Sequence, residues 1–237
     1  PIPSGTPGST VTTTVTLSNS GSATVTFTPV VVINGVSTTL APVTLAPGQS
    51  TLSAPITVPL TTTGATVTAL VGTTSVADSN PANNSDTLST NALFADVSTT
   101  VDLPASAPAG SVISVTVTFT NSASGATATT ASAVVGTVTL SSGQVQTYTL
   151  GNLAPGASVT QVFTATVPNS SATTALSATS TVATSTHESN SANNSASDSL
   201  IVLLADPGVD VNPIPSGTPG STVTTTVTLS NSGSATV

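Results

Sequence analysis

Apolar and polar residues alternate along much of this chain with a period of two. In segments 9–18 and 111–120 every second residue is apolar or Thr, and the residues between them are mostly hydroxylated. The two apolar sets are Val11, Thr13, Val15 and Leu17, and Ile113, Val115, Val117 and Phe119. A period of two predicts strands with one buried face, and we find no helical periodicity in the sequence.

Turn signals recur between these segments along the chain. Asn34-Gly35 between two apolar runs predicts a type I′ hairpin, and Ala-Pro-Gly at 46–48 and 154–156 predicts two further turns. The Asn-rich stretches at 78–86 and 188–196 predict a late hairpin in each half. Roughly seven short strands per half indicate an all-β fold, an antiparallel sandwich of the immunoglobulin-like kind.

The chain repeats itself on two scales. Segment 213–237 is identical to segment 1–25, so a second copy of the sequence begins at position 213. A weaker repeat of about half that period returns LAPGQS at 45–50 as LAPGAS at 153–158, and DSNPANNSD at 78–86 as ESNSANNSA at 188–196. The sequence therefore predicts a linear array of two alternating sandwich types.

These repeats define three segments. Residues 1–94 form unit A, which lacks its entry strand, and residues 95–204 form unit B. Residues 205–237 are the start of the next unit A. A third of a sandwich exposes its apolar face, so we expect it to need partners. These come either from continuation of the array in a longer chain, the simpler source, or from strand donation to a neighbouring molecule.

Landmarks in both units resemble a known family. They are an Ala-Asp entry at 95–96, Gly-Ser before an alternating strand, Thr-Asn-Ser or Leu-Ser-Asn-Ser at the end of that strand, Leu-Ala-Pro-Gly, and Asn-Asn-Ser opening the last strand. This pattern resembles the cell-adhesion-related domain of bacteria (CARDB) and a similar conserved repeat of prokaryotic surface proteins. The resemblance implies tandem Ig-like sandwiches on large extracellular proteins, and it brings no catalytic residues.

Charge narrows the possible partners. The chain has eight acidic residues, no Lys or Arg and a net charge of −8. Nucleic acids and anionic membranes attract Lys and Arg, so we expect neither as a partner. No apolar run is long enough to cross a membrane, so we expect no insertion within this segment. Without Lys or Arg the chain also offers no site to trypsin-like proteases, which suits an exposed extracellular location.

Residues for catalysis are scarce. The chain has one His, one Tyr and no Cys, and His187 lies at the start of an expected surface hairpin. No Gly-x-Ser-x-Gly elbow is present to activate a serine. We therefore expect no enzyme activity, no catalytic or cofactor-binding residues and no cofactor.

The acidic residues fall into two windows, each running from the last hairpin of one unit into the first strand of the next. One window holds Asp78, Asp86, Asp96 and Asp102, and the other holds Glu188, Asp198, Asp206 and Asp210. If each window meets at a junction between sandwiches, its carboxylates and Asn side chains offer oxygen ligands to Ca²⁺. The alternative is a few solvated loop charges, and no Asp-x-Asp-x-Asp motif distinguishes the two, so no metal ligand is assigned.

Surface features leave two more alternatives open. The sequons at Asn83, Asn169 and Asn193 predict glycosylation only in a host that performs it. Rows of Thr suggest an ice-binding face, but twisted sheets rarely present the flat array that such a face requires, and β-branching explains Thr in strands.

These observations together predict a structural repeat segment of an extracellular filament or cell-surface stalk. Its partners would be neighbouring repeat units of the same chain or identical chains. The alternative is an adhesin module that binds a glycan or protein, assisted by Ca²⁺. Sandwiches built on ten-residue strands would advance such a filament by about 60 to 80 Å per A–B pair.

Overall fold

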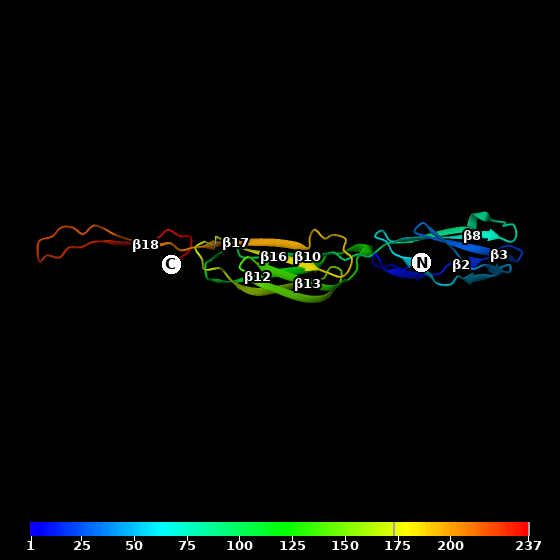
Figure 1. The fold of residues 1–237 in the computed structure, drawn as a ribbon, viewed down its shortest axis with the longest axis horizontal. Coiled ribbons are helices and arrows are strands. Elements are labelled where there is room, and N and C mark those ends of the chain that lie inside the picture. Colours follow the sequence, from blue (N-terminus) through cyan, green and yellow to red (C-terminus); the bar gives the residue numbers. More distant parts are fainter. Residues whose placement is uncertain (173, 237) are drawn as a thin grey trace.

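The computed structural model describes every residue except 173 and 237, and the regular secondary structure of the described residues is almost entirely strand. Short 3₁₀ turns lie at Pro81–Asn83 and Gly125–Thr127. The all-β prediction is confirmed. Figure 1 shows two groups of strands one after the other along the long axis, followed by an extended hairpin.

The first group of strands, which we call the first sandwich, lies within residues 1–93, and its strands span residues 10–90. One layer contains the pairs β1–β7 and β2–β6, and the other contains β4, β3, β8 and β9 in that order, with β5 also paired to β3. The strands are β1 (Thr10–Thr13), β2 (Thr16–Ser18), β3 (Val25–Ile33), β4 (Val36–Thr39), β5 (Val43–Leu45), β6 (Ser50–Leu52), β7 (Ile56–Pro59), β8 (Ala65–Thr74) and β9 (Ser85–Thr90).

The second sandwich occupies residues 97–203. A three-stranded sheet in the order β10-β12-β15 faces a five-stranded sheet in the order β11-β17-β16-β13-β14. All of its pairs are antiparallel except β11–β17, which is parallel. The strands are β10 (Val97–Asp102), β11 (Ser106–Pro108), β12 (Val112–Asn121), β13 (Ala131–Leu140), β14 (Val145–Leu153), β15 (Ser158–Thr166), β16 (Ala175–Ala183) and β17 (Ser195–Leu203).

The alternating pattern places the core as predicted. Ile113, Val115, Val117 and Phe119 are all buried on β12 and join one cluster with residues of the facing sheet. In the first sandwich Leu17 is buried and Val15 is partly buried. Its core divides into two smaller clusters, one around Val58 and one around Phe27.

The predicted turns are also present. Asn34 has φ 48° and Gly35 has φ 85°, which is the pair of positive values that a type I′ hairpin requires. Gly48 and Gly156 both have φ 77° after Pro, and the residue after each glycine donates its N–H to the carbonyl of the Ala that opens the turn. This geometry is typical of type II turns, where Gly avoids a Cβ clash.

The strand predicted within segment 9–18 is interrupted in the structure, whereas β12 is continuous. The partner strand changes from β6 to β7 around Pro55, which has no N–H to donate to a ladder. Ser53 bridges the gap, since its Oγ accepts the Val15 N–H and its own N–H donates to the Val15 carbonyl. The inward and outward faces stay in phase across the interruption.

The chain passes from the first sandwich to the second over a very short connection. Leu93 N–H donates to Gly5 O in the first sandwich, while Phe94 N–H donates to Thr127 O and Ala95 N–H donates to His187 O in the second. Successive backbone groups are therefore bonded to different sandwiches. The short connection leaves little free chain between them.

Beyond the second sandwich, β18 (Pro207–Val211) and β19 (Val227–Asn231) form the terminal hairpin. Its apolar side chains are largely uncovered: Val209 is 69% exposed and Leu229 is 79% exposed. Figure 1 shows this hairpin at the end of the molecule opposite to the first sandwich.

Candidate functional site: an open groove in the first sandwich

The two sandwiches differ at one edge. In the second sandwich, β10 pairs with β12 and packs across β16 and β17. In the first sandwich, β1 and β2 take the place of β12, and no strand is paired along their outer edge among the residues that the structure describes. The side chains that such a strand would cover remain open.

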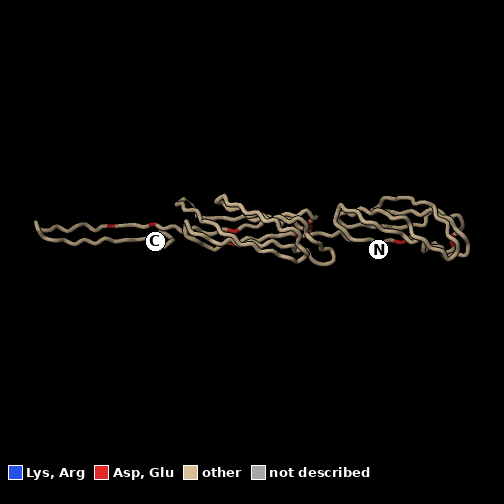
Figure 2. Tube along the Cα trace, turned by 90° about the horizontal axis from the view of Figure 1, so that it is seen from below, with Lys and Arg blue, Asp and Glu red and all other residues tan. Residues whose placement is uncertain are grey.

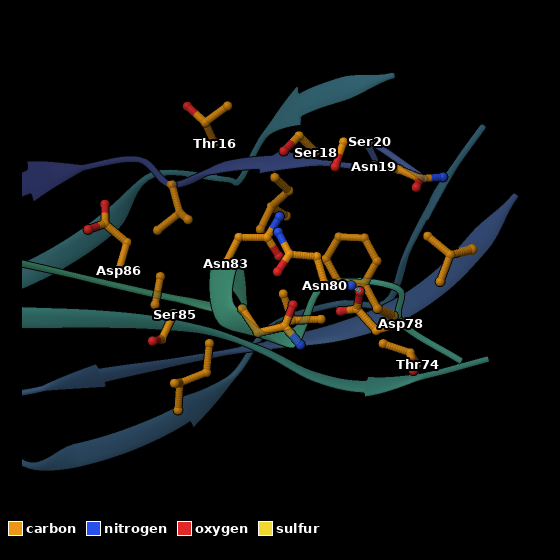
Figure 3. A pocket seen from close by; sticks show the side chains of 18 of the residues that line it. Thr16, Ser18, Asn19, Ser20, Thr74, Asp78, Asn80, Asn83, Ser85 and Asp86 are labelled. Carbon is orange, nitrogen blue, oxygen red and sulfur yellow. Dashed lines mark hydrogen bonds between the residues drawn. The ribbon is translucent and has the colours of Figure 1, made fainter. Parts of the chain in front are cut away.

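The open edge forms a groove with a volume of about 420 Å³. We call it the entry-strand groove and define it by residues on its two sides, which are Val15, Leu17, Asn19, Ala69, Asn83 and Leu88. Figure 3 shows Asp78, Asn80 and Asn83 facing Ser18 and Asn19 across it.

The groove has an apolar floor and a polar end. Leu88, 46% exposed, is among its uncovered apolar residues, with Leu70 and Val76. Asp78 uses its Oδ1 to accept the Asn80 N–H at 2.8 Å, which fixes the loop at the polar end. An apolar trough beside an unpaired strand edge has the chemistry to bind an extended peptide.

An asparagine closes the corresponding corner of each unit, and it is buried in the two sandwiches. In the second sandwich Asn121 Nδ2 donates to Thr129 O and Leu153 O, while Oδ1 accepts the N–H groups of Asp96 and Ala123. In the terminal hairpin Asn231 Oδ1 accepts the N–H groups of Asp206 and Gly233.

Asn19 is the counterpart in the first sandwich. Its Nδ2 donates to Ala23 O and Leu45 O, and its Oδ1 accepts the Gly21 N–H. Within the described chain, no N–H takes the place that Asp96 and Asp206 occupy in the other two corners. Sequence reasoning noted the Asn-Ser landmark but did not assign it this role, because one of its partners, Leu45, lies on a distant strand, β5.

A polar cluster lies at the end of the second sandwich that faces the first. Asn193 Nδ2 donates to Asp96 Oδ1 at 2.9 Å, and Asn194 Nδ2 donates to Glu188 Oε2 at 2.7 Å. Burial raises the pKa of Glu188, the bond from Asn194 opposes that shift, and the charge of Asp96 adds to it. The remaining side-chain oxygens of Glu188, Asn193 and Asn194 are buried without a hydrogen-bond partner in the structure.

The structure separates the acidic windows that the sequence grouped. Asp78 and Asp86 line the entry-strand groove of the first sandwich, whereas Asp96 is bonded to Asn193 of the second. The hairpin that carries Glu188 meets the entry strand of its own sandwich, through the bridge between Ala95 and Glu188. The expected meeting of carboxylates from two sandwiches is therefore wrong, because the late hairpin and the entry strand of one unit lie at the same end.

The other acidic residues are also dispersed along the trace in Figure 2. Asp198 Oδ2 accepts the Leu103 N–H, and Asp206 Oδ2 accepts the Ser232 hydroxyl. Asp102 is the last residue of β10, and Asp210 lies within β18. Among the described residues, no three His, Cys, Asp or Glu side chains gather as a metal site would require. The expectation of Ca²⁺ at the junctions stays a prediction.

The remaining candidates are placed as follows. His187 is exposed, and its ring lies 5.9 Å from that of Phe94, centroid to centroid. Asn83 and Asn169 are exposed, whereas Asn193 is partly buried and bonded to Asp96. Within the described part of the chain, no helix is both long and apolar enough to span a membrane.

Comparison with known proteins gives two results. No protein-family model and no curated protein sequence matches the chain. Among solved structures, the chain is similar to the CARDB domain of a Pyrococcus furiosus protein, seen in a solution NMR structure and in a crystal structure in complex with di-metal ions.

The NMR structure is 17% identical with a TM-score of 0.39, and the match covers 46% of this chain and 96% of that one. The crystal structure is 16% identical with a TM-score of 0.38, and the match covers 47% and 94%. Both solved structures are of a CARDB domain, the family that the sequence landmarks resemble.

Proposed function

We propose that this chain is a structural repeat segment of an extracellular filament or cell-surface stalk, in which alternating sandwiches span distance and support attachment. The observation that carries the proposal is the terminal hairpin. Segment 213–237 repeats segment 1–25. The strand β18 precedes this segment and pairs with β19 in the same way as β10 pairs with β12 in the second sandwich. A new sandwich therefore begins where the second one ends.

The connection between sandwiches supports the same proposal. Because the backbone bonds of Leu93 and Phe94 belong to different sandwiches, bending at this point is restricted. Units that contact only their neighbours extend along one dimension. We also propose that the segment has no catalytic chemistry, since its one His is exposed and its acidic residues are dispersed.

Imaging of native material by electron microscopy tests the proposal. We expect filaments with an axial repeat of about 60 to 80 Å, corresponding to one A–B pair. Labelling with an antibody against the second sandwich is expected to mark the filament once per repeat. Native material that is compact, or that lacks this axial repeat, would contradict the proposal.

A second candidate is an adhesin module that binds a glycan or protein. The entry-strand groove favours it, because Asp78, Asn80 and Asp86 offer polar groups beside an apolar trough. Binding of a glycan or a protein ligand to the isolated chain, abolished by Asp78→Ala together with Asn80→Ala, would favour this candidate. Binding unchanged by these substitutions would exclude the groove as its site.

A further inference from the structure

The two sandwich types differ where their two sheets meet. The entry strand of the second sandwich, the B type, is β10, and that of the A type that begins after it is β18. We propose that three pairs of positions make each type accept strands of its own type and reject those of the other. The inference rests on the proposed function, in which the two types alternate along one chain.

The two entry strands correspond in register. β10 pairs with β12 so that Thr99 faces Phe119, and β18 pairs with β19 so that Val209 faces Leu229. Phe119 and Leu229 hold the same place in the repeat, because each lies two residues before the asparagine of the Asn-Ser landmark. Val209 of the A type therefore stands at the position of Thr99 of the B type.

The first pair of positions is polar in the B type and apolar in the A type. Thr99 and Ser180 are both buried, and their hydroxyl groups share a 2.6 Å hydrogen bond between β10 and β16. Ala69 stands at the position of Ser180, because the β8–β9 and β16–β17 ladders give both the same register to the Asn-Asn-Ser landmark. An A-type strand, with Val209, would leave the Ser180 hydroxyl buried without its partner.

The second pair lies just beyond the entry strand. Asp198 Oδ2 accepts the Leu103 N–H at 2.8 Å in the second sandwich. In the A type, Pro213 stands at the position of Leu103 and has no N–H, and Leu88 stands at the position of Asp198. The acceptor is thus present in the type whose strand has a donor, and it is replaced in the type whose strand has none.

The third pair joins the strand after the entry strand to the facing sheet. A Cβ on Gly136 would lie 2.3 Å from the ring of Phe119. In the A type Leu17 stands at the position of Phe119, and the buried Pro29 stands at that of Gly136, two residues before the strand position that faces the first pair. Phe119 would therefore collide with Pro29, whereas Leu17 would leave a cavity beside Gly136.

Both members differ between the types at each of the three pairs. Each type therefore satisfies its own buried groups, and a mixed combination leaves a polar group unpaired, a clash or a cavity. Discrimination between similar partners depends on such penalties for the wrong combination. Tandem sandwiches are prone to exchange strands with a neighbour or with a second copy, and these pairs oppose exchange between the two types.

A double-mutant cycle tests the first pair. Thr99→Val alone and Ser180→Ala alone are each expected to raise the equilibrium constant for unfolding of the second sandwich about tenfold, because one hydroxyl then lacks its partner. Together they are expected to raise it less than about threefold, since they form the apolar pair of the A type. Urea denaturation followed by the fluorescence of Tyr148 measures the cycle. Thr100→Val with Ser177→Ala, at exposed positions of the same strands, is the control, with a change below about twofold.

Refolding of two mixed full-length chains tests the discrimination itself. The donor chain carries Asp210→Cys and the acceptor chain carries Thr118→Cys, which faces Thr100 on β10 and would face position 210 on an exchanged A-type strand. The chain has no natural cysteine, so a disulfide between donor and acceptor reports exchange. The natural acceptor is expected to give little of this product, because its own entry strand matches and the A-type strand does not.

Conversion of the acceptor should reverse this preference. Ser180→Ala with Asp198→Leu is expected to raise the yield of mixed disulfide at least about tenfold, because these residues match the A-type strand and no longer match β10. Ser177→Ala with Ser199→Ala, at exposed positions of the same two strands, is the matched control and should leave the yield unchanged. Adding Thr99→Val to the converted acceptor should lower the yield again, because its own strand then matches position 180.

Two outcomes would overturn the inference. One is additivity of Thr99→Val and Ser180→Ala in the unfolding experiment, and the other is an equal yield of mixed disulfide for the natural and the converted acceptor. Unselective exchange alongside a normal axial repeat in native material would reject the inference alone. Selective pairing in native material without an axial repeat would reject the proposed function alone.

Discussion

At the scale of single residues, one asparagine per unit ties together segments that are distant in the sequence. Asn121 is fully buried and bonds the entry strand, the end of β14 and the loop after β12 through four backbone groups. An amide is suited to this role, because it offers two donors and an acceptor with two lone pairs without a charge.

Replacement of this amide tests its contribution. Asn121→Ala is expected to lower the free energy of unfolding of the second sandwich by about 3 kcal/mol, because buried backbone groups lose their partners. Urea denaturation followed by the fluorescence of Tyr148, the one tyrosine of the chain, reports this sandwich specifically. Asn231→Ala in the exposed hairpin is the control, with an expected change below about 0.5 kcal/mol. Equal effects of both substitutions would contradict the role of Asn121.

Charge gives a second prediction at this scale. Burial raises the pKa of Glu188, so its carboxylate is less stable in the folded chain than in the unfolded chain. That penalty is absent below the unfolded pKa and grows as the pH rises through the folded pKa. Stability contributed by Glu188 is therefore higher at pH 3 than at pH 7. The chain has no Lys or Arg whose ion pairs acid would break.

We accordingly expect folding that changes little between pH 7 and pH 3, with a small rise in stability on acidification. Glu188→Gln should stabilise the chain at pH 7 by less than about 1 kcal/mol and should reduce the difference between the two pH values. Thermal melts followed by circular dichroism measure both effects. A sharp unfolding transition on acidification would contradict the prediction.

At the scale of strands, the two sandwiches fill the same space with different large residues. In the second, Phe119 on β12 is fully buried, and a Cβ on Gly136 of β13 would overlap its ring. In the first sandwich, Leu17 stands at the position of Phe119. Phe27, on the facing sheet, stands at the position that Val134 has on β13, and it supplies the aromatic ring there. The aromatic core side chain therefore lies on opposite sheets in the two sandwiches.

This complementarity predicts coupling between positions 136 and 119. Gly136→Ala is expected to lower the free energy of unfolding by about 2 kcal/mol through overpacking. Combined with Phe119→Leu, the same substitution should cost about 1 kcal/mol less than it does alone, because the smaller side chain leaves room for the added methyl group. Denaturation of the two single variants and the double variant, followed by Tyr148 fluorescence, measures this cycle. Additive effects would show that the two positions are independent.

At the scale of the whole molecule, stability is distributed unevenly along the axis. The second sandwich has one continuous core, whereas the first has two smaller clusters beside an open groove. The terminal hairpin has no opposing sheet in the described chain, and a two-stranded hairpin alone is marginally stable in water.

Proteolysis should report this gradient. Elastase, which cleaves after small residues, is expected to remove the chain beyond about position 204 first and to leave the two sandwiches. Trypsin should leave the chain intact, because it contains no Lys or Arg. Mass spectrometry of timed digests identifies the products. Cleavage within residues 1–204 at the same rate as in the hairpin would contradict the expected gradient.

The sequence by itself determined the class of structure. Alternation placed Val115, Val117 and Phe119 in the core, and Asn34-Gly35 and the Ala-Pro-Gly turns lie where their backbone preferences placed them, because strand faces and tight turns depend on neighbouring residues. The identity of segment 213–237 with segment 1–25 is likewise read from the sequence alone.

Only the tertiary structure decided where the groove lies and which residues meet there. Asp78 was grouped with Asp96 by sequence position, yet the fold places them in different sandwiches. The bonds of Asn121 and the pairing of Thr99 with Ser180 were likewise absent from the local pattern. Such contacts depend on strand order and register between segments far apart in the chain, and the alternation of apolar residues is compatible with many such arrangements.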